Sequence, residues 1–250
     1  MEARGGFADA VAAVAGVEGW MTDGQARVLW DRAAALDPAA TVVEIGSYRG
    51  RSAIVLARAA PEGVAVVAID PHAGNDRGPQ QIRGSASEGE EDHQTFVANL
   101  ASTGVAERVR HVRLPSQDAL GSVDGPVMLL YIDGAHRYRP ARDDIGRWGA
   151  RVRTGGTMLI HDSFSSIGVT LAIVRLLLAG RRFRYVGRTG SLAEYRADRL
   201  ASPRARVRNT ARQLLELPWF ARNLIVKLAI VLRLRPVARA LGHRSGPWPY

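Results

Sequence analysis

One short stretch, residues 42–50, constrains the fold of this chain more than any other. It reads Val-Val-Glu-Ile-Gly-Ser-Tyr-Arg-Gly, a β-branched run that ends in Glu44, followed by Gly46 and, four residues later, Gly50. From Ser52 onward the apolar residues have helical spacing. The pattern predicts a buried strand, a tight glycine turn and the N-terminus of a helix, where free backbone N–H groups favour an anionic ligand group.

A second strand followed by an acid comes next along the chain. Residues 64–69 form another apolar run, and Asp70 follows it. Nucleotide-binding α/β folds place an acid at this distance to bind ribose hydroxyls, although an acid at a strand end can also cap a helix. Between Gly46 and Gly50 there is no glycine at the middle position, where a nicotinamide dinucleotide fingerprint needs one to admit a pyrophosphate. The two patterns together indicate a nucleoside-containing cofactor and argue against a dinucleotide.

The first 195 residues alternate predicted strands with predicted helices. Near-continuous apolar strands joined by helices predict a mostly parallel sheet covered on both faces, a doubly wound, Rossmann-like α/β fold with a terminal antiparallel hairpin. The long polar stretch 72–92 is expected to be a lid or disordered, with His72 and His93 exposed beside it. The predicted strands are 41–45, 64–69, 109–114, 127–132, 157–160, 183–187 and 191–195, and the predicted helices are 25–36, 51–60, 93–103, 140–150 and 167–179, with a turn at Gly155-Gly156.

The positive charge of the chain is concentrated near its C-terminal end. The formal net charge is +10, yet residues 1–195 hold equal numbers of basic and acidic side chains, so residues 196–250 carry all of the excess. We therefore expect two parts, a domain over 1–195 and a basic, partly helical extension over 196–250. The chain has no cysteine, which excludes disulfides, thiolate metal sites and cysteine nucleophiles. Neither a signal-peptide layout nor a membrane-spanning apolar run is present in the sequence, so a cytoplasmic location is expected.

Four motifs stand in a fixed order between residues 20 and 195. They are Glu44-Ile-Gly-Ser-Tyr-Arg-Gly-Arg-Ser52; Asp70; Ser116-Gln117-Asp118; and, at two strand ends, Tyr131-Ile-Asp-Gly-Ala-His136 with Gly156-Thr-Met-Leu-Ile-His-Asp162. In this order they resemble the class I S-adenosylmethionine-dependent methyltransferases. Within that class they look most like the small-molecule O-methyltransferases of the catechol O-methyltransferase type and their relatives with an Asp-Gly-x-His motif.

The resemblance implies S-adenosyl-L-methionine as the cofactor. The glycine loop would lie under the methionine part of the cofactor, and the reacting groups would gather at the ends of the fourth and fifth strands. The cofactor-binding residues implied are Glu44, Gly46, Tyr48, Gly50 and Ser52 in the glycine loop, Asp70 at the ribose, and Ser116 and Gln117 beside the adenine.

Two acids at predicted strand ends, Asp133 and Asp162, indicate where the reaction takes place. Methyl transfer needs an acceptor oxygen that is held in line with the donor and loses its proton as it attacks. The two carboxylates are suited to hold Mg²⁺, which would orient the acceptor and lower its pKa. In metal-dependent relatives an Asn or Asp follows the second acid as a third ligand, and here Ser163, a weaker ligand, takes that place. His161 is an alternative ligand that would shift the preference towards transition metals.

His136 lies three residues after Asp133, where the catechol-type enzymes carry their catalytic base. An imidazole with a pKa near neutrality suits this role, so His136 and Asp133 are the predicted catalytic residues. Asp143 or Asp144 would orient the imidazole ring, or would instead favour the N-terminus of a helix.

The C-terminal extension shares none of these motifs. Pro218 can start a helix and Pro236 should end one, which predicts a helix over about 219–235. Its polar sector includes Asn223 and Lys227, and its apolar centre suits an interfacial helix on anionic lipid. A helix that packs on protein or forms a homodimer fits the same residues, and RNA binding is a third alternative.

Two functions follow from these residues. The first is an S-adenosylmethionine-dependent methyltransferase that acts on an oxygen of a hydroxylated small molecule, sugar or glycolipid head group; nucleic acid is not an expected partner. The second is a non-catalytic, cofactor-binding or membrane-peripheral assembly protein that uses the basic extension over residues 204–240.

Overall fold

The computed structural model describes residues 5–75 and 84–243. Within these residues seven strands form one sheet, in the order β3-β2-β1-β4-β5-β7-β6. All neighbouring pairs from β3 to β5 are parallel, whereas β7 is antiparallel to both β5 and β6. This is the predicted Rossmann-like sheet with its antiparallel hairpin. The strands are β1 (Thr41–Ile45), β2 (Ala65–Ile69), β3 (Val109–Val112), β4 (Val127–Ile132), β5 (Val152–Ile160), β6 (Arg184–Thr189) and β7 (Leu192–Arg196).

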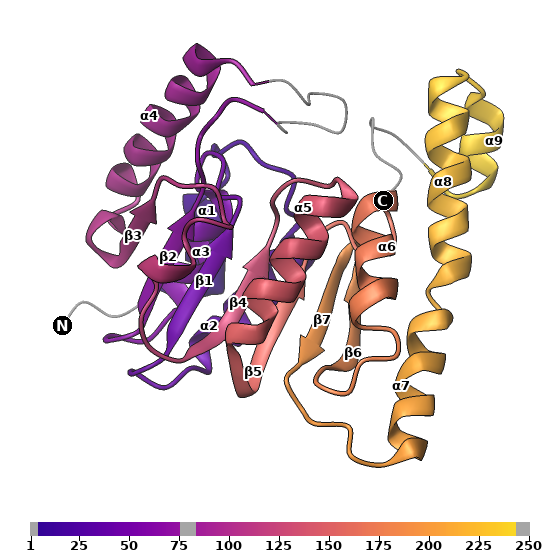
Figure 1. Cartoon of the computed structure of the whole chain (residues 1–250). Coiled ribbons are helices and arrows are strands. Elements are labelled where there is room, and N and C mark those ends of the chain that lie inside the picture. Colours follow the sequence, from indigo (N-terminus) through magenta and orange to yellow (C-terminus); the bar gives the residue numbers. More distant parts are fainter. Residues whose placement is uncertain (1–4, 76–83, 244–250) are drawn as a thin grey trace.

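Helices cover both faces of this sheet (Figure 1). Alternation along the strands produces two apolar cores: Val42 and Leu129 face one, and Val43 and Leu130 face the other. The first core packs against α2 and α3, and the second against α5 and α6. The helices are α1 (Phe7–Ala13), α2 (Asp23–Ala34), α3 (Arg51–Ala59), α4 (Ala86–Ser102), α5 (Tyr138–Asp143), α6 (Ile167–Leu176), α7 (Pro203–Leu214), α8 (Leu217–Val231) and α9 (Arg235–Ala240), with short 3₁₀ turns at Ala106–Arg108, Leu120–Ser122 and Gly149–Arg151 and a π turn at Asp144–Trp148.

The register of the central strands brings their ends to one level. Ile45 is paired with Ile69 of β2 and with Ile132 of β4, which is paired in turn with Ile160 of β5. The residue that follows each of these isoleucines therefore lies at the same edge of the sheet. These residues are Gly46, Asp70, Asp133 and His161.

Two predictions about local structure were wrong. The polar stretch 72–92 is not a connection throughout, because α4 begins at Ala86, where Ser85 caps it by accepting the Glu88 backbone N–H; residues 76–83 of that stretch lie outside the described residues. Gly155-Gly156 does not precede a strand but lies inside β5. There residues 153–156 stand opposite the single residue Met128 of β4, so the pairing of the two strands is irregular. Gly155 has φ +82°, so this irregularity needs a residue without a Cβ.

The extension packs along the hairpin edge of the sheet instead of forming a separate body (Figure 1). Asn209 on α7 accepts the Tyr185 backbone N–H of β6 at 2.7 Å. Tyr195 of β7 donates its hydroxyl to Gln213 at 3.1 Å, and Tyr185 donates to Glu216 at 2.7 Å. The side-chain oxygens of the buried Asn209 and Gln213 therefore accept hydrogen bonds from the sheet, and protein packing is one role of the extension.

The single long helix predicted in the extension is two helices. α8 ends at Val231, and Pro236 lies in the first turn of α9, where a missing N–H costs nothing. Asn223 and Lys227, from the predicted polar sector, face the domain: they donate to the backbone carbonyls of Phe164 and Ser165 at 3.3 and 2.8 Å. Among the described residues no helix combines the length and apolar character needed to cross a membrane.

Candidate active site

A pocket of about 410 Å³ opens at the edge of the sheet where the central parallel strands end. Its wall contains predicted residues from each of the four motifs. They are Gly46, Tyr48, Ser52, Asp70, Ser116, Gln117, Asp133 and His136. A pocket at the carboxyl ends of the strands of an open α/β sheet is where such folds bind their ligands.

The glycine loop is held by Asp70. One oxygen of this carboxylate accepts the backbone N–H groups of Ser47 and Tyr48 at 2.8 and 2.9 Å, and the other accepts the His72 N–H at 2.8 Å. A carboxylate has about four acceptor positions, so one remains for a ribose hydroxyl. Asp70 therefore orders the loop as well as facing the pocket, and it does not cap a helix.

Gly46 is required by a close approach between two strand ends. Its φ is +85°, and a Cβ there would lie 2.3 Å from the carbonyl oxygen of Asp133. Any side chain would push apart the two segments that carry the loop and the reacting groups.

Glu44 lies behind the pocket wall. It is fully buried, and one carboxylate oxygen accepts the hydroxyl of Ser52 while the other has no hydrogen bond. Burial raises the pKa of Glu44 to about 7, despite the opposing hydrogen bond from Ser52. Ser52, which the resemblance implied as a cofactor-binding residue, lines the pocket, but its hydroxyl is directed to Glu44.

Replacing Glu44 by glutamine is expected to stabilise the protein at high pH. The pKa of Glu44 is about 7 in the folded chain against 4.5 for the free side chain, so wild-type stability falls as the pH rises through this interval. Glu44→Gln keeps an acceptor for Ser52 and has no proton to lose. Its free energy of unfolding should match that of the wild type at low pH and exceed it by about 3 kcal/mol above pH 7.

Chemical denaturation of both proteins across this pH range measures the difference. Glu62→Gln, at an exposed acid, is the matched control and should leave the pH dependence of stability unchanged. A constant difference between Glu44→Gln and wild type at every pH would contradict the prediction.

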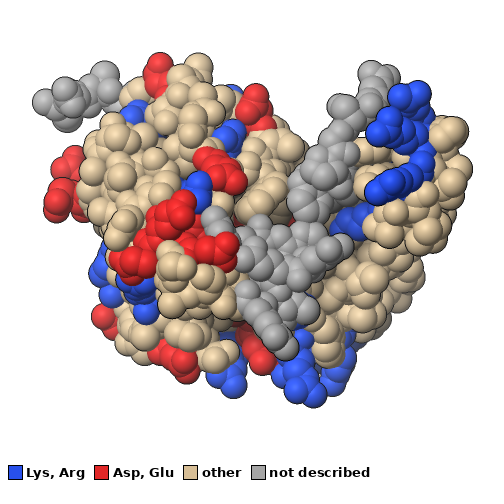
Figure 2. Space-filling view, turned by 90° about the horizontal axis from the view of Figure 1, so that it is seen from above, with Lys and Arg blue, Asp and Glu red and all other residues tan. Residues whose placement is uncertain are grey.

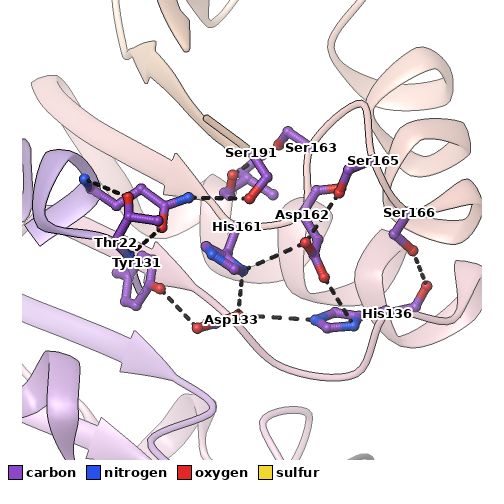
Figure 3. Close-up of polar contacts among 12 residues, drawn as sticks. Thr22, Tyr131, Asp133, His136, His161, Asp162, Ser163, Ser165, Ser166 and Ser191 are labelled. Carbon is purple, nitrogen blue, oxygen red and sulfur yellow. Dashed lines mark hydrogen bonds and ion pairs between the residues drawn. The ribbon is translucent and has the colours of Figure 1, made fainter. Parts of the chain in front are cut away.

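Four titratable side chains from the ends of β4 and β5 meet beside the pocket (Figure 3). His136 Nδ1 lies 3.1 Å from Asp162 Oδ2, and His136 Nε2 lies 3.9 Å from Asp133 Oδ1. The ring of His161 lies between the two acids, with Nδ1 3.0 Å from Asp133 Oδ1 and 3.8 Å from Asp162 Oδ1. Tyr131 donates its hydroxyl to Asp133 at 2.8 Å. The group alternates acid and imidazole, so its charges offset one another.

The pKa values in this group follow from its alternation. Burial disfavours the imidazolium forms, but the charges of the neighbouring carboxylates outweigh this effect. The pKa of His161 is raised to about 9, mainly by Asp133. The pKa of His136 is raised above its ordinary value, mainly by Asp162. Burial would raise the pKa of Asp133, but the two imidazoles hold it below its ordinary value.

The residues do not fit the Mg²⁺ site that the resemblance suggests. The Ser163 hydroxyl is fully buried and donates to the Ile160 carbonyl at 2.8 Å, so it does not join the two acids. The imidazole of His161 takes the space between Asp133 and Asp162 that a hard cation would need. The donor atoms that do converge, within 4.8 Å of one another, belong to Asp133, His136 and His161, a set that suits a borderline transition ion better than Mg²⁺.

Turnover is therefore expected to be unchanged in excess chelator and not to rise when Mg²⁺ is added. Assays of methyl transfer before and after dialysis against chelator test this expectation. A loss of activity that Mg²⁺ alone restores would contradict it, and a loss that only Mn²⁺ or Zn²⁺ restores would point to the Asp133, His136 and His161 donors instead.

Neither Asp143 nor Asp144 orients the His136 ring, whereas Asp144 does lie at the start of the π turn, as the alternative predicted. Asp143 pairs with the exposed Arg142, whereas Asp144 is buried in the π turn, lines the pocket and accepts the Ser116 hydroxyl. Burial raises the pKa of Asp144 to about 6. The His136 ring is oriented by Asp162 instead.

Other residues that line the pocket belong to none of the sequence motifs. Trp20 and Met21, from the segment before α2, line the pocket, and the Trp20 ring lies 5.3 Å from that of Tyr48. His72, predicted to be exposed, is buried with Nε2 2.8 Å from the Tyr48 carbonyl oxygen, and His93 is partly buried. An aromatic residue beside Gly19 was the available signal for Trp20, but single apolar residues of this kind are more often part of a core.

Comparisons with known proteins agree with this geometry. The model of a protein family described as a methyltransferase domain matches residues 43–163. The chain is similar to cofactor-bound Rv0187 from MTB, with 23% identity, a TM-score of 0.54 and coverage of 77% of this chain and 89% of that one. It is similar to the O-methyltransferase TomG from Streptomyces achromogenes, crystallised with SAM, at 19% identity, a TM-score of 0.52 and the same coverage. An O-methyltransferase from Bacillus cereus in complex with SAH matches at 16% identity and a TM-score of 0.50, covering 76% of this chain and 87% of that one. At these identities the structural similarity establishes the shared fold.

Proposed function

We propose that this chain, an S-adenosylmethionine-dependent methyltransferase with the class I fold, methylates an oxygen of a hydroxylated small molecule, sugar or glycolipid head group. The observation that carries the proposal is the group of Asp133, His136 and Asp162 beside a pocket that the glycine loop also lines. In this proposal residues 1–195 of a cytoplasmic protein carry out catalysis, and residues 196–250 form the extension.

The cofactor-binding wall is proposed to run from the glycine loop to Ser116 and Gln117. Asp70 would accept a ribose hydroxyl through its remaining acceptor position. Ser116 and Gln117 would lie against the adenine, with the buried Asp144 fixing the position of Ser116. When bound, the cofactor supplies an electrophilic methyl group on a sulfonium.

His136 is proposed to act as the general base. Asp162 holds Nδ1 at 3.1 Å, and Nε2, which lies 3.9 Å from Asp133, would take the proton of the acceptor hydroxyl as the oxygen bonds to the methyl carbon. The bound cofactor would supply the methyl group and would retain the electron pair of the C–S bond as a neutral thioether. Asp133 is a positioning residue here, because it contacts both imidazoles and Tyr131.

Calorimetric titration with S-adenosylmethionine and with its demethylated product tests the function. We expect both to bind at one site per chain, because the pocket volume lies in the range that encloses a ligand of this size. If neither compound binds, the proposal is refuted.

A second candidate function is a cofactor-binding protein without catalysis, associated with membranes or assemblies through the extension. The observation that favours it is the large exposed apolar area of α8. Cofactor binding with no methyl transfer to any hydroxylated acceptor, in wild type and His136→Ala alike, would support this alternative.

A further inference from the structure

The outer face of the C-terminal helices carries an apolar stripe with helical spacing. Ile225, Leu228 and Leu232 succeed one another at three and four residues and are 49%, 58% and 56% exposed. Leu214 and Leu217 continue the stripe where α7 meets α8, and Val231 adds to it at 70% exposure. Water-exposed apolar area of this extent marks an interaction surface.

Arginines predominate among the charged side chains around this stripe. The exposed arginines of α7, α9 and the turn between α8 and α9 are Arg204, Arg208, Arg212, Arg233, Arg235 and Arg239. The acids of the described extension are Asp198 and Glu216, which pair with Arg184 and Arg188 of the hairpin at 2.7 and 2.6 Å. Figure 2 shows Lys and Arg side chains gathered along the side of the molecule that the extension forms, with most of the acids on the other side.

The opposite face of α8 fixes the direction of the stripe. Asn223 and Lys227 bind the carbonyls of Phe164 and Ser165, and the Ser165 hydroxyl donates to Asp162 at 3.1 Å. The apolar stripe is therefore held outward, about one helix diameter, ~10 Å, from the segment that carries part of the candidate active site.

We infer that this outer face of α7, α8 and α9 lies in the plane of an anionic lipid bilayer. The leucines would enter the boundary between head groups and acyl chains, and the arginines would contact the anionic head groups. A second copy of the chain fits less well, because two such faces would bring arginines together with no acids to pair them. A polyanion such as RNA would leave the leucines in water.

Co-sedimentation of the full-length protein with vesicles tests the inference. We expect binding to vesicles of phosphatidylcholine mixed with phosphatidylglycerol, no binding to phosphatidylcholine alone, and weakening as salt is added. The double variant Leu228→Glu with Leu232→Glu should lose binding. The triple variant Arg233→Gln, Arg235→Gln and Arg239→Gln should bind about a hundredfold more weakly.

Two matched variants on other surfaces are the controls. Val97→Glu adds a charge at a half-exposed apolar position on α4, and Arg153→Gln removes an exposed arginine from β5; neither should change vesicle binding. All variants should bind S-adenosylhomocysteine as the wild type does, which shows that they are folded and separates this inference from the proposed function.

Equal sedimentation of the wild type and the Leu228/Leu232 variant would overturn the inference. So would light scattering that reports a dimer dissociated by the same two substitutions, because the stripe would then be a contact between copies of the chain. If the wild type itself does not bind S-adenosylhomocysteine, the proposed function is refuted, whereas the inference about the membrane-facing surface still stands.

Discussion

Replacing His136 by alanine is expected to lower the turnover of methyl transfer by about a hundredfold to ten-thousandfold, the usual contribution of a positioned general base. The affinity for S-adenosylmethionine should change little, because the cofactor would be held by Asp70 and the glycine loop, whose backbone contacts do not involve His136. Steady-state kinetics with calorimetry of cofactor binding separates the two effects.

The pH dependence of turnover gives a second readout. His136 faces Asp162, Asp133 and His161, and the nearby carboxylates raise its pKa despite burial. A base must be unprotonated, so turnover should increase as the pH rises through this raised pKa, and His136→Ala should lose that increase. His93→Ala, at a partly buried histidine outside this group, is the matched control and should keep both the rate and its pH profile. Wild-type turnover in His136→Ala would remove His136 from the mechanism.

Replacing Asp70 by alanine is expected to weaken cofactor binding by at least about a hundredfold. The substitution removes a charged acceptor from the N–H groups of Ser47, Tyr48 and His72 and also the acceptor proposed for the ribose. The glycine loop would then no longer be held in the position from which its backbone N–H groups can bind the cofactor. Calorimetric titration with S-adenosylhomocysteine measures the loss.

Asp70→Asn separates the charge and acceptor capacity of this carboxylate from its size. The amide retains one acceptor oxygen and is nearly the same size, so it should recover part of the affinity, whereas a purely steric role would be recovered in full. Wild-type affinity in Asp70→Ala would show that neither the loop contacts nor the ribose contact matters for binding.

The strands were predictable because their signal is local. Apolar runs such as 127–132 form strands buried on both faces, and their order along the chain, with helices between them, left few arrangements of the sheet. The start of α4 was missed because Ala86 to Asp92 has the Gly, Ser and Glu composition of a loop, and packing of a buried Asp92 against Arg49 is not visible in a linear sequence.

The candidate site was predictable in part for the same reason. Gly46, Asp70 and Asp133 each follow a strand, so the parallel sheet alone brings them to one edge. The partners of these residues were not predictable. That Asp70 holds the loop amides, that Ser52 faces Glu44 and that Asp162 orients His136 depend on side-chain directions across several elements.

The sequence by itself determined the kind of protein this is, because strand periodicity, a glycine turn and acids at strand ends are local patterns that the sheet register converts into one pocket. Only the tertiary structure decided what the acids bind. Folding places the His161 imidazole between Asp133 and Asp162 and turns Ser163 towards a backbone carbonyl. It also docks the polar side of α8 on the domain and leaves the leucines outside. Contacts between residues so far apart in the chain depend on distances in space, which a linear pattern does not contain.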